Sequence, residues 1–155
     1  MKKILMMLLA ALLVFSFAGC DDDEEKKDAV VIVTPGKTFN VTEDNFVDGD
    51  YARFKMNVLQ DTTYSITVTS VDADGNTKTD AEFNVAAYAS EEDMLDNENY
   101  FADEPCVAGV VFIDEVTGND FYGDDTEAGA GYAYFDILTY DGNKTYTIDV
   151  ETTSK

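Results

Sequence analysis

The sequence contains no histidine, no tryptophan, two cysteines, two prolines and ten basic residues against 32 acidic ones. Without histidine, the chain forms neither a Ser-His-Asp nor a Cys-His catalytic arrangement, and it has no imidazole for a zinc site. The formal net charge of −22 argues against a nucleic-acid partner, because phosphates require Lys and Arg. It also argues against electrostatic docking on anionic lipid.

The first twenty residues have the pattern of an export signal. They begin with Lys2 and Lys3, continue with an almost unbroken apolar run over residues 4–18, and end in Phe17-Ala18-Gly19-Cys20. The run is shorter than the roughly 20 residues that span a bilayer, and its basic start and small residues before a cleavage point are typical of a signal peptide. The last four residues resemble the lipobox of bacterial lipoproteins, with Phe17 in place of the usual leucine. The resemblance implies cleavage after residue 19 and lipidation of Cys20; an uncleaved helix or an ordinary secretion signal is the alternative.

The mature chain would begin with an acidic segment, residues 20–28, which contains six Asp and Glu residues and two lysines. Such a block is expected to be a solvated tether that holds the domain off the membrane. Acidic runs after a lipidated cysteine also resemble surface-export signals of Bacteroidetes lipoproteins, whereas an Asp directly after the cysteine resembles inner-membrane retention in enteric bacteria. We expect an extracytoplasmic, lipid-anchored protein, with the outer membrane or cell surface favoured over the inner membrane.

From residue 29 onward the sequence alternates with period two, which predicts strands over 29–33, 38–41, 51–59, 64–71, 81–88, 107–113, 132–140 and 145–150. The run 107–113 is apolar on both faces, which predicts a strand buried on both sides. About eight short strands rich in Val, Thr, Tyr and Phe predict an all-β protein, an antiparallel jelly-roll-like β-sandwich over residues 29–155. One short helix is expected over residues 90–97, with Ser90 as its N-cap. Cys106 is expected to be a small buried residue without a disulfide partner.

Two stretches of the sequence resemble each other. Tyr51-Ala52-Arg53-Phe54 returns 81 residues later as Tyr132-Ala133-Tyr134-Phe135, and the following strand, Tyr64-Ser65-Ile66-Thr67-Val68, returns 82 residues later as Tyr146-Thr147-Ile148-Asp149-Val150. Asp141-Gly142 in the second copy is typical of a tight hairpin turn. We therefore expect two hairpins that perform the same structural task in the two sheets, or a chance similarity of alternating strands.

These strands carry a family resemblance. Asp48-Gly49-Asp50-Tyr51-Ala52-Arg53-Phe54 with the strand after it, the strand that begins at Phe83-Asn84-Val85, and the closing Tyr146-Thr147-Ile148-Asp149-Val150 resemble bacterial prepeptidase C-terminal domains. The resemblance covers residues 38–151, and departs from the family in Lys144-Thr145, where a glycine is expected, and in the acidic insert 91–104. It implies a non-catalytic, jelly-roll-like sandwich, associated in some members with carbohydrate or protein binding.

Calcium is the one cofactor that the sequence indicates as an alternative. Asp72, Asp74 and Asn76 place oxygen ligands at alternate positions around Gly75, although the order is not that of an EF-hand. A plain hairpin turn between the flanking strands is the favoured interpretation. A second acidic loop holds Asp120, Phe121, Tyr122 and Asp124, and it is either a calcium loop or a ligand-binding lip.

These patterns favour a non-catalytic binding module for a glycan or a protein ligand, with Phe101, Phe121 and Tyr122 as its loop aromatics. A structural or accessory subunit of an envelope complex is the alternative. A carboxylate-based hydrolase is less favoured, because among 32 acidic residues a pair of carboxylates carries little information. Gly129-Ala130-Gly131 precedes a strand rather than a helix, so it is not a phosphate loop.

Overall fold

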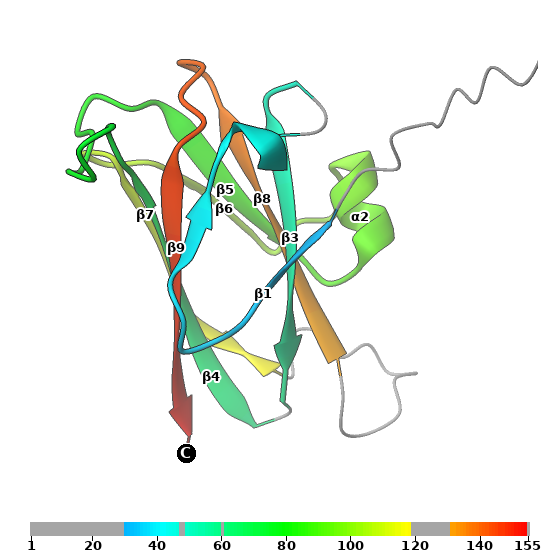
Figure 1. Ribbon diagram of the computed structural model, residues 1–155. Coiled ribbons are helices and arrows are strands. Elements are labelled where there is room, and N and C mark those ends of the chain that lie inside the picture. Colours follow the sequence, from blue (N-terminus) through cyan, green and yellow to red (C-terminus); the bar gives the residue numbers. More distant parts are fainter. Residues whose placement is uncertain (1–29, 47–48, 60, 119–130, 155) are drawn as a thin grey trace, which may run out of the picture.

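The computed structural model describes residues 30–154 except 47–48, 60 and 119–130. Within these ranges, the chain forms two sheets packed face to face, with strand orders β1-β3-β8-β5-β6 and β2-β9-β4-β7 (Figure 1). The strands are β1 (Val31–Val33), β2 (Phe39–Val41), β3 (Tyr51–Val58), β4 (Thr62–Ser70), β5 (Phe83–Tyr88), β6 (Ala102–Pro105), β7 (Val110–Thr117), β8 (Gly131–Thr139) and β9 (Tyr146–Ser154). The predicted all-β sandwich is confirmed, with one departure from the antiparallel pattern: β1 runs parallel to β3.

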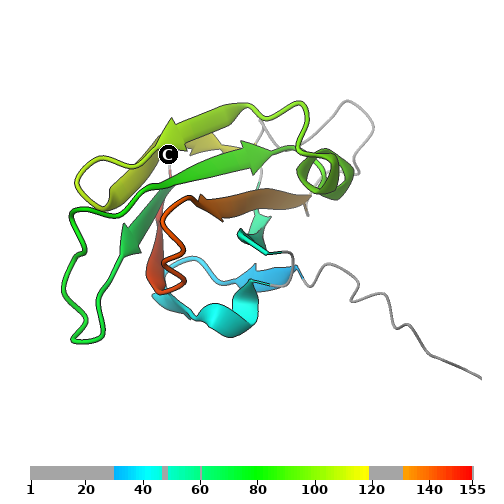
Figure 2. The ribbon, with the colours of Figure 1, turned by 90° about the horizontal axis from the view of Figure 1, so that it is seen from above.

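Two short helices interrupt the strands: the 3-10 helix η1 (Glu43–Asn45) and the α-helix α2 (Glu91–Asp96). No helix among the described residues has the length and hydropathy needed to cross a membrane. Seen from above, α2 lies at one end of the sandwich, on the side away from the four-stranded sheet (Figure 2). It contacts β5 and β8 of the five-stranded sheet, so it covers part of that sheet's outer face.

The alternation in the sequence fixes which side chains enter the core. In β3, Ala52, Phe54 and Met56 are fully buried, and in β4 the side chains of Tyr64 and Ile66 are buried as predicted. Alternate residues of a strand point to opposite faces, so each strand contributes one apolar row to the space between the sheets. The inward rows of the two sheets therefore form a single core.

Aromatic rings fill the centre of that core. Phe54 and Phe135 stack with ring centroids 5.3 Å apart, and Phe39 meets Phe54 edge-on at 6.0 Å. On the facing sheet, Tyr146 meets Phe83 edge-on at 4.9 Å. Offset and edge-to-face pairs of this kind add about 0.5–1.5 kcal/mol to the burial of the rings themselves.

The expected hairpins are not hairpins. β3 and β4 follow each other in sequence but lie in different sheets, and the same is true of β8 and β9. Instead, β3 pairs with β8 and β4 pairs with β9, both antiparallel. The loop 72–80 likewise connects β4 and β5, which lie in different sheets. Each of these loops passes from one sheet to the other at an end of the sandwich (Figure 1).

The prediction that residues 107–113 are buried on both faces is wrong. β7 lies at the edge of the four-stranded sheet, with Val111 and Ile113 buried and Phe112 55% exposed between them. Val107 precedes the strand and is 74% exposed. Because only one layer covers this strand, its outward residues face solvent even though they are apolar.

Cys106 is half-buried rather than buried, and it is a free thiol. Its Sγ donates a hydrogen bond to the Ala81 carbonyl oxygen at 2.8 Å. The thiol thus links the end of β6 to the segment that enters β5, and it packs against the main core.

The predicted helix is confirmed as α2, and a polar side chain caps its first turn. Ser90 Oγ accepts a hydrogen bond from the Asp93 backbone N–H at 3.1 Å, which satisfies one of the N–H groups left free in the first turn. The helix ends at Asn97, whose φ of 54° is left-handed, a conformation that Asn tolerates better than most residues. The acidic insert 91–104 contains α2 and most of β6 (Ala102–Pro105), a short strand that the sequence did not indicate.

Candidate functional site: a tyrosine-lined pocket on the five-stranded sheet

The residues proposed from the sequence fall into two groups. Cys20 and the acidic aromatic loop with Asp120, Phe121, Tyr122 and Asp124 lie outside the described residues. Asp72, Asp74 and Asn76 are described, and they form the turn after β4.

The carboxylate of Asp72 is engaged with its own turn. Its Oδ1 accepts hydrogen bonds from the backbone N–H groups of Asp74 and Asn76, both at 2.9 Å. The Asn76 N–H is the main cause that lowers the pKa of Asp72 below its ordinary value. Among the described residues, no three Asp, Glu, Cys or His side chains form a group suited to a metal ion. The geometry is that of an Asx turn, in which an Asp closes a loop through its side chain.

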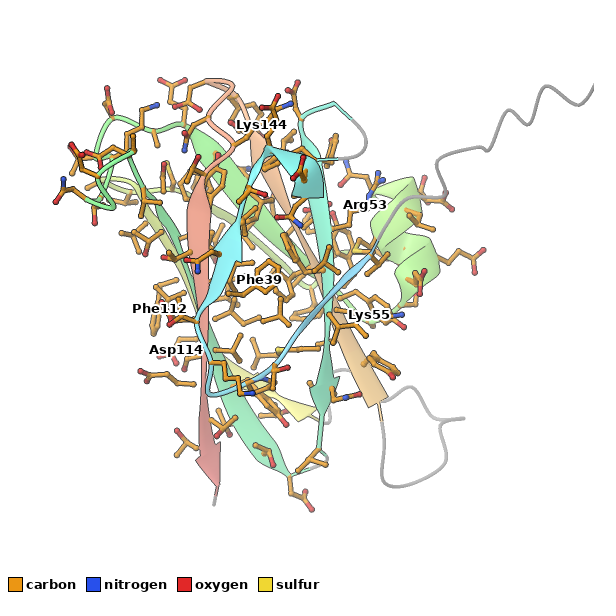
Figure 3. All side chains as sticks on the ribbon, in the orientation of Figure 1. Phe39, Arg53, Lys55, Phe112, Asp114 and Lys144 are labelled. Atoms are coloured by element: carbon orange, nitrogen blue, oxygen red, sulfur yellow. The ribbon has the colours of Figure 1, made fainter. Side chains whose placement is uncertain are left out.

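Phe101, the third loop aromatic, is exposed between α2 and β6. It borders a shallow hollow between β6 and β7 together with Glu104, Phe112 and Asp114. Figure 3 shows Phe112 and Asp114 on the side of the molecule opposite to α2. This hollow joins the edges of the two sheets and carries two exposed aromatic rings.

A better-formed pocket lies on the outer face of the five-stranded sheet, beside α2. It encloses about 200 Å³, and its lining residues are Tyr51, Asn84, Ala86, Asn97, Tyr100, Asp103, Asp136, Leu138 and Tyr140. We call this the tyrosine pocket. Strand register explains why these residues meet: Tyr51 is paired with Leu138, and Leu138 is paired with Asn84. In the next outward row, Asp136 is paired with Ala86 and Ala86 with Asp103.

The floor of the tyrosine pocket contains a buried carboxylate. Asp136 is only 2% exposed, and Arg53, its partner in the register of β3 and β8, is 5% exposed. Both point away from the core, and Figure 3 shows Arg53 on the α2 side of β3. Its guanidinium lies over the Tyr51 ring, 5.5 Å from the ring centroid. A buried acid near a guanidinium is costly to desolvate, so it is weak evidence for stability, and its place in a pocket makes it a candidate functional group.

Tyr88 connects this carboxylate to the end of α2. Its hydroxyl oxygen lies 2.8 Å from Asn97 Oδ1 and 3.2 Å from Asp136 Oδ2. A phenol has one hydrogen to donate, so it cannot donate to both oxygens at once. Either Asp136 is protonated and donates to Tyr88, or the Asn97 amide is rotated so that its nitrogen donates to Tyr88. The position of α2 and the charge of Asp136 are therefore linked through one hydroxyl group.

The pKa values of two groups in the tyrosine pocket are raised by burial. Burial raises the pKa of Asp136 to about 6, against the opposing effects of the Tyr88 hydroxyl and the Arg53 charge. Burial also raises the pKa of Tyr140, and the neighbouring Asp103 raises it further. The pocket thus combines the phenol of Tyr140, which these effects keep protonated at neutral pH, with a carboxylate whose pKa lies near neutral pH.

The sequence contained a signal for this pocket that alternation arguments overlooked. Tyr132, Tyr134, Leu138 and Tyr140 occupy the outward positions of β8 and its end, where polar residues are the norm, and Asp136 stands among them. An outward row of tyrosines around one carboxylate marks a surface that is not merely solvated. The contributions of α2 and β6 could not be placed, because they depend on the pairing of strands.

A comparison with solved structures supports the fold class. The crystal structure of a pre-peptidase C-terminal domain, from a collagenase of Bacillus anthracis, matches with a TM-score of 0.50 and 15% sequence identity. The match covers 79% of this chain and 95% of that domain. No protein-family model matches the chain, and no curated protein does.

The chain is therefore a β-sandwich protein with a fold like that of pre-peptidase C-terminal domains, as its strand motifs predicted. At 15% identity the likeness concerns the fold alone. What the protein does has to be argued from its own surface.

Proposed function

We propose that the protein is a non-catalytic binding module that holds a glycan or a protein ligand at the tyrosine pocket. The observation that carries this proposal is the convergence of Tyr51, Tyr100 and Tyr140 with amide and carboxylate groups in one hollow. Concave sites with aromatic walls and a few polar groups are typical of ligand binding. Tyr100 and Tyr140 are 52% and 58% exposed, so their rings are accessible to a ligand.

We further propose that the module works at a bacterial membrane, outside the cytoplasm, held by an acylated Cys20. The motive is the signal-like pattern of the first twenty residues. The acidic segment 20–28 would then be an extended spacer of at most about 30 Å. The module would bind ligands close to the membrane that carries it.

The experiment is a binding screen with the mature chain, residues 20–155. The core clusters and both sheets lie within residues 30–154, so this chain carries the complete sandwich. We expect immobilised glycans or envelope proteins to retain the wild type, and Tyr100→Ala and Tyr140→Ala to lower retention at least about fivefold. Phe112→Ala, on the opposite sheet, is the matched control and should bind as the wild type does. Equal retention of all four proteins would place binding elsewhere.

A structural or accessory role in an envelope complex is the second candidate. The hollow between β6 and β7, with Phe101 41% and Phe112 55% exposed, favours it, because exposed aromatic patches often mark contacts with other proteins. Under this alternative, Phe112→Ala would weaken co-purification with envelope proteins, and the tyrosine variants would not. The same preparations should release no product from the glycans they bind; turnover would make the protein a carboxylate-based hydrolase instead.

A further inference from the structure

We propose that the tyrosine pocket selects glycans that carry a free, protonated amino sugar, and that the ammonium group enters the pocket between the rings and the carboxylates. This inference rests on the proposed glycan-binding function and names the ligand class for that site. It follows from the charges that line the pocket, from its aromatic walls and from its size.

The residues that line the tyrosine pocket carry negative charge. Two carboxylates line the pocket, Asp136 at the floor and Asp103 at the rim, and no Lys or Arg is among its described lining residues. Arg53 is the cation that acts on Asp136, and it offsets one of the two negative charges. The remaining charge is negative, in a chain whose net charge is −22. Such a field attracts a cation and repels the carboxylate or sulfate groups of acidic glycans.

The tyrosine rings that form the walls of the pocket can attract a cation. Tyrosine faces attract ammonium and guanidinium groups through the negative charge of the ring face. The outer face of this sheet already shows the interaction twice: Arg53 lies over Tyr51 at 5.5 Å, and Lys55 Nζ lies over the Tyr132 ring at 5.2 Å. Lys55 and Arg53 both project from this side of β3 (Figure 3). A ligand ammonium beside Tyr51, Tyr100 and Tyr140 would extend the same pattern.

The size of the pocket limits how much of the ligand it can hold. A volume of about 200 Å³ is below the range of roughly 300–1,000 Å³ typical of drug-sized ligands. The pocket therefore suits one ring of a longer chain. Asn84 Nδ2 donates to Asp103 Oδ1 at 3.2 Å, which holds the rim carboxylate in place and leaves its other oxygen for the ligand. The carbon faces of a sugar ring can stack on the exposed tyrosines while its hydroxyls meet Asn97 or water.

The charged amino group distinguishes the proposed ligand from related sugars. N-acetylation removes the charge of an amino sugar and adds an acetyl group that the carboxylates cannot pair with. An ordinary hexose has the same ring but brings no cation for Asp103, the carboxylate that Arg53 does not offset. Glucosamine, N-acetylglucosamine and glucose tetramers therefore differ in the feature that this inference concerns, and they form a matched set of probes.

The experiment measures the affinity of the mature chain for these three tetramers by calorimetry at pH 7 and low salt. We expect the glucosamine tetramer to bind about tenfold more tightly than either neutral tetramer, with an affinity that falls as salt is added. Asp103→Asn should remove most of this preference, because it deletes the rim charge and keeps the side-chain shape. Asp114→Asn, an equal change of charge on the outer face of the other sheet, is the control and should leave the preference intact.

Each other outcome has a definite meaning. Equal binding of all three tetramers, lost in Tyr100→Ala, would keep the binding module and overturn the amino-sugar inference. Tighter binding of the N-acetylated tetramer would also overturn it. A lysine-rich peptide that displaces the glucosamine tetramer and binds more tightly would make the ligand a basic protein and overturn it. If none of these probes binds, the amino-sugar inference fails, and retention on immobilised glycans or envelope proteins decides the proposed function separately.

Discussion

The ring of Phe54 stacks on the ring of Phe135, with centroids 5.3 Å apart and planes 23° apart, and these two residues are equivalent positions of the internal repeat. They are also directly opposite each other in the antiparallel pair of β3 and β8. In the other sheet, Thr67 and Asp149 are opposite each other and 82 residues apart, the spacing of the second repeated strand. Each pair thus brings equivalent positions of the repeat directly opposite each other, with β3 against β8 in one sheet and β4 against β9 in the other.

Removal of the ring of either Phe54 or Phe135 should destabilise the whole sandwich. We expect Phe54→Ala and Phe135→Ala each to lower the free energy of unfolding by about 3–5 kcal/mol, because each leaves a cavity between the sheets. Phe112→Ala, which removes an exposed ring, should cost less than about 1 kcal/mol. Urea unfolding followed by tyrosine fluorescence measures all three. Similar losses for Phe54→Ala and Phe112→Ala would contradict the position of the core.

Gly109 should tolerate alanine much less well than Gly75. Both glycines have positive φ, of 80° and 82°, so alanine costs about 1–2 kcal/mol at either position. A Cβ on Gly109 would lie 2.3 Å from the Lys78 carbonyl oxygen, whereas a Cβ on Gly75 would meet nothing within 4 Å. Backbone cannot yield easily, so we expect Gly109→Ala to cost a further 1–3 kcal/mol or so. Equal melting temperatures of the two variants would show that Gly109 does not lie this close to the Lys78 backbone in solution.

The buried carboxylate of Asp136 predicts a pH dependence of stability. Its pKa in the folded protein is about 6, against an ordinary value of 3.8, so folding favours the protonated form. This contribution is complete below about pH 4 and is lost as the pH rises through 6, and it amounts to about 3 kcal/mol. Asp136→Asn, which is neutral throughout, should lack this loss and be more stable than the wild type at pH 7. Parallel curves of unfolding free energy against pH for the two proteins would refute the prediction.

Calcium should leave the melting temperature unchanged if the turn at Asp72 is closed by its own backbone. Both the Asp74 and Asn76 N–H groups bind one oxygen of that carboxylate, which weakens it as a metal ligand. A bound ion would instead stabilise the fold by RT ln(1 + [L]/Kd), about 2.7 kcal/mol at one hundred times Kd. Melting in chelator and in millimolar calcium distinguishes the two cases. A rise that Asp72→Asn abolishes would establish the calcium site at this turn, whereas a rise that persists would direct attention to Asp120 and Asp124.

Cys20 should be the first residue of the mature protein and carry acyl chains. Wild-type protein made in a bacterial host is expected to incorporate labelled fatty acid and to partition into detergent. Cys20→Ala should remain unprocessed or be released without label. Equal labelling of the two proteins would exclude lipidation at this residue.

The sequence predicted the core better than it predicted the pairing of strands. The rows of Phe54, Ile66 and Val85 were correct because alternation reports which face of a strand is buried. Two consecutive strands show the same alternation whether they form a hairpin within one sheet or lie in different sheets joined by a crossing loop. The Asp141-Gly142 turn therefore suggested a hairpin where the chain in fact changes sheet.

The pocket was missed for a related reason. Tyr51 and Tyr140 are far apart in sequence, and they meet because the start of β3 pairs with the end of β8. Tyr100 and Asp103 come from the acidic insert, which has no periodicity. Sequence reasoning turned instead to Phe121 and Tyr122, since loops between strands often carry binding residues.

The place of β9 has a consequence for how the protein is made. This last strand lies between β2 and β4 in its sheet, so neither neighbour is complete until residues 146–154 have been synthesised. Until then, β4 and β2 present free backbone edges that can join strands of other chains. The four-stranded sheet therefore cannot close before β9 has been made. Chains that end before Tyr146, and so lack β9, are thus expected to aggregate or be degraded rather than to persist as a smaller domain.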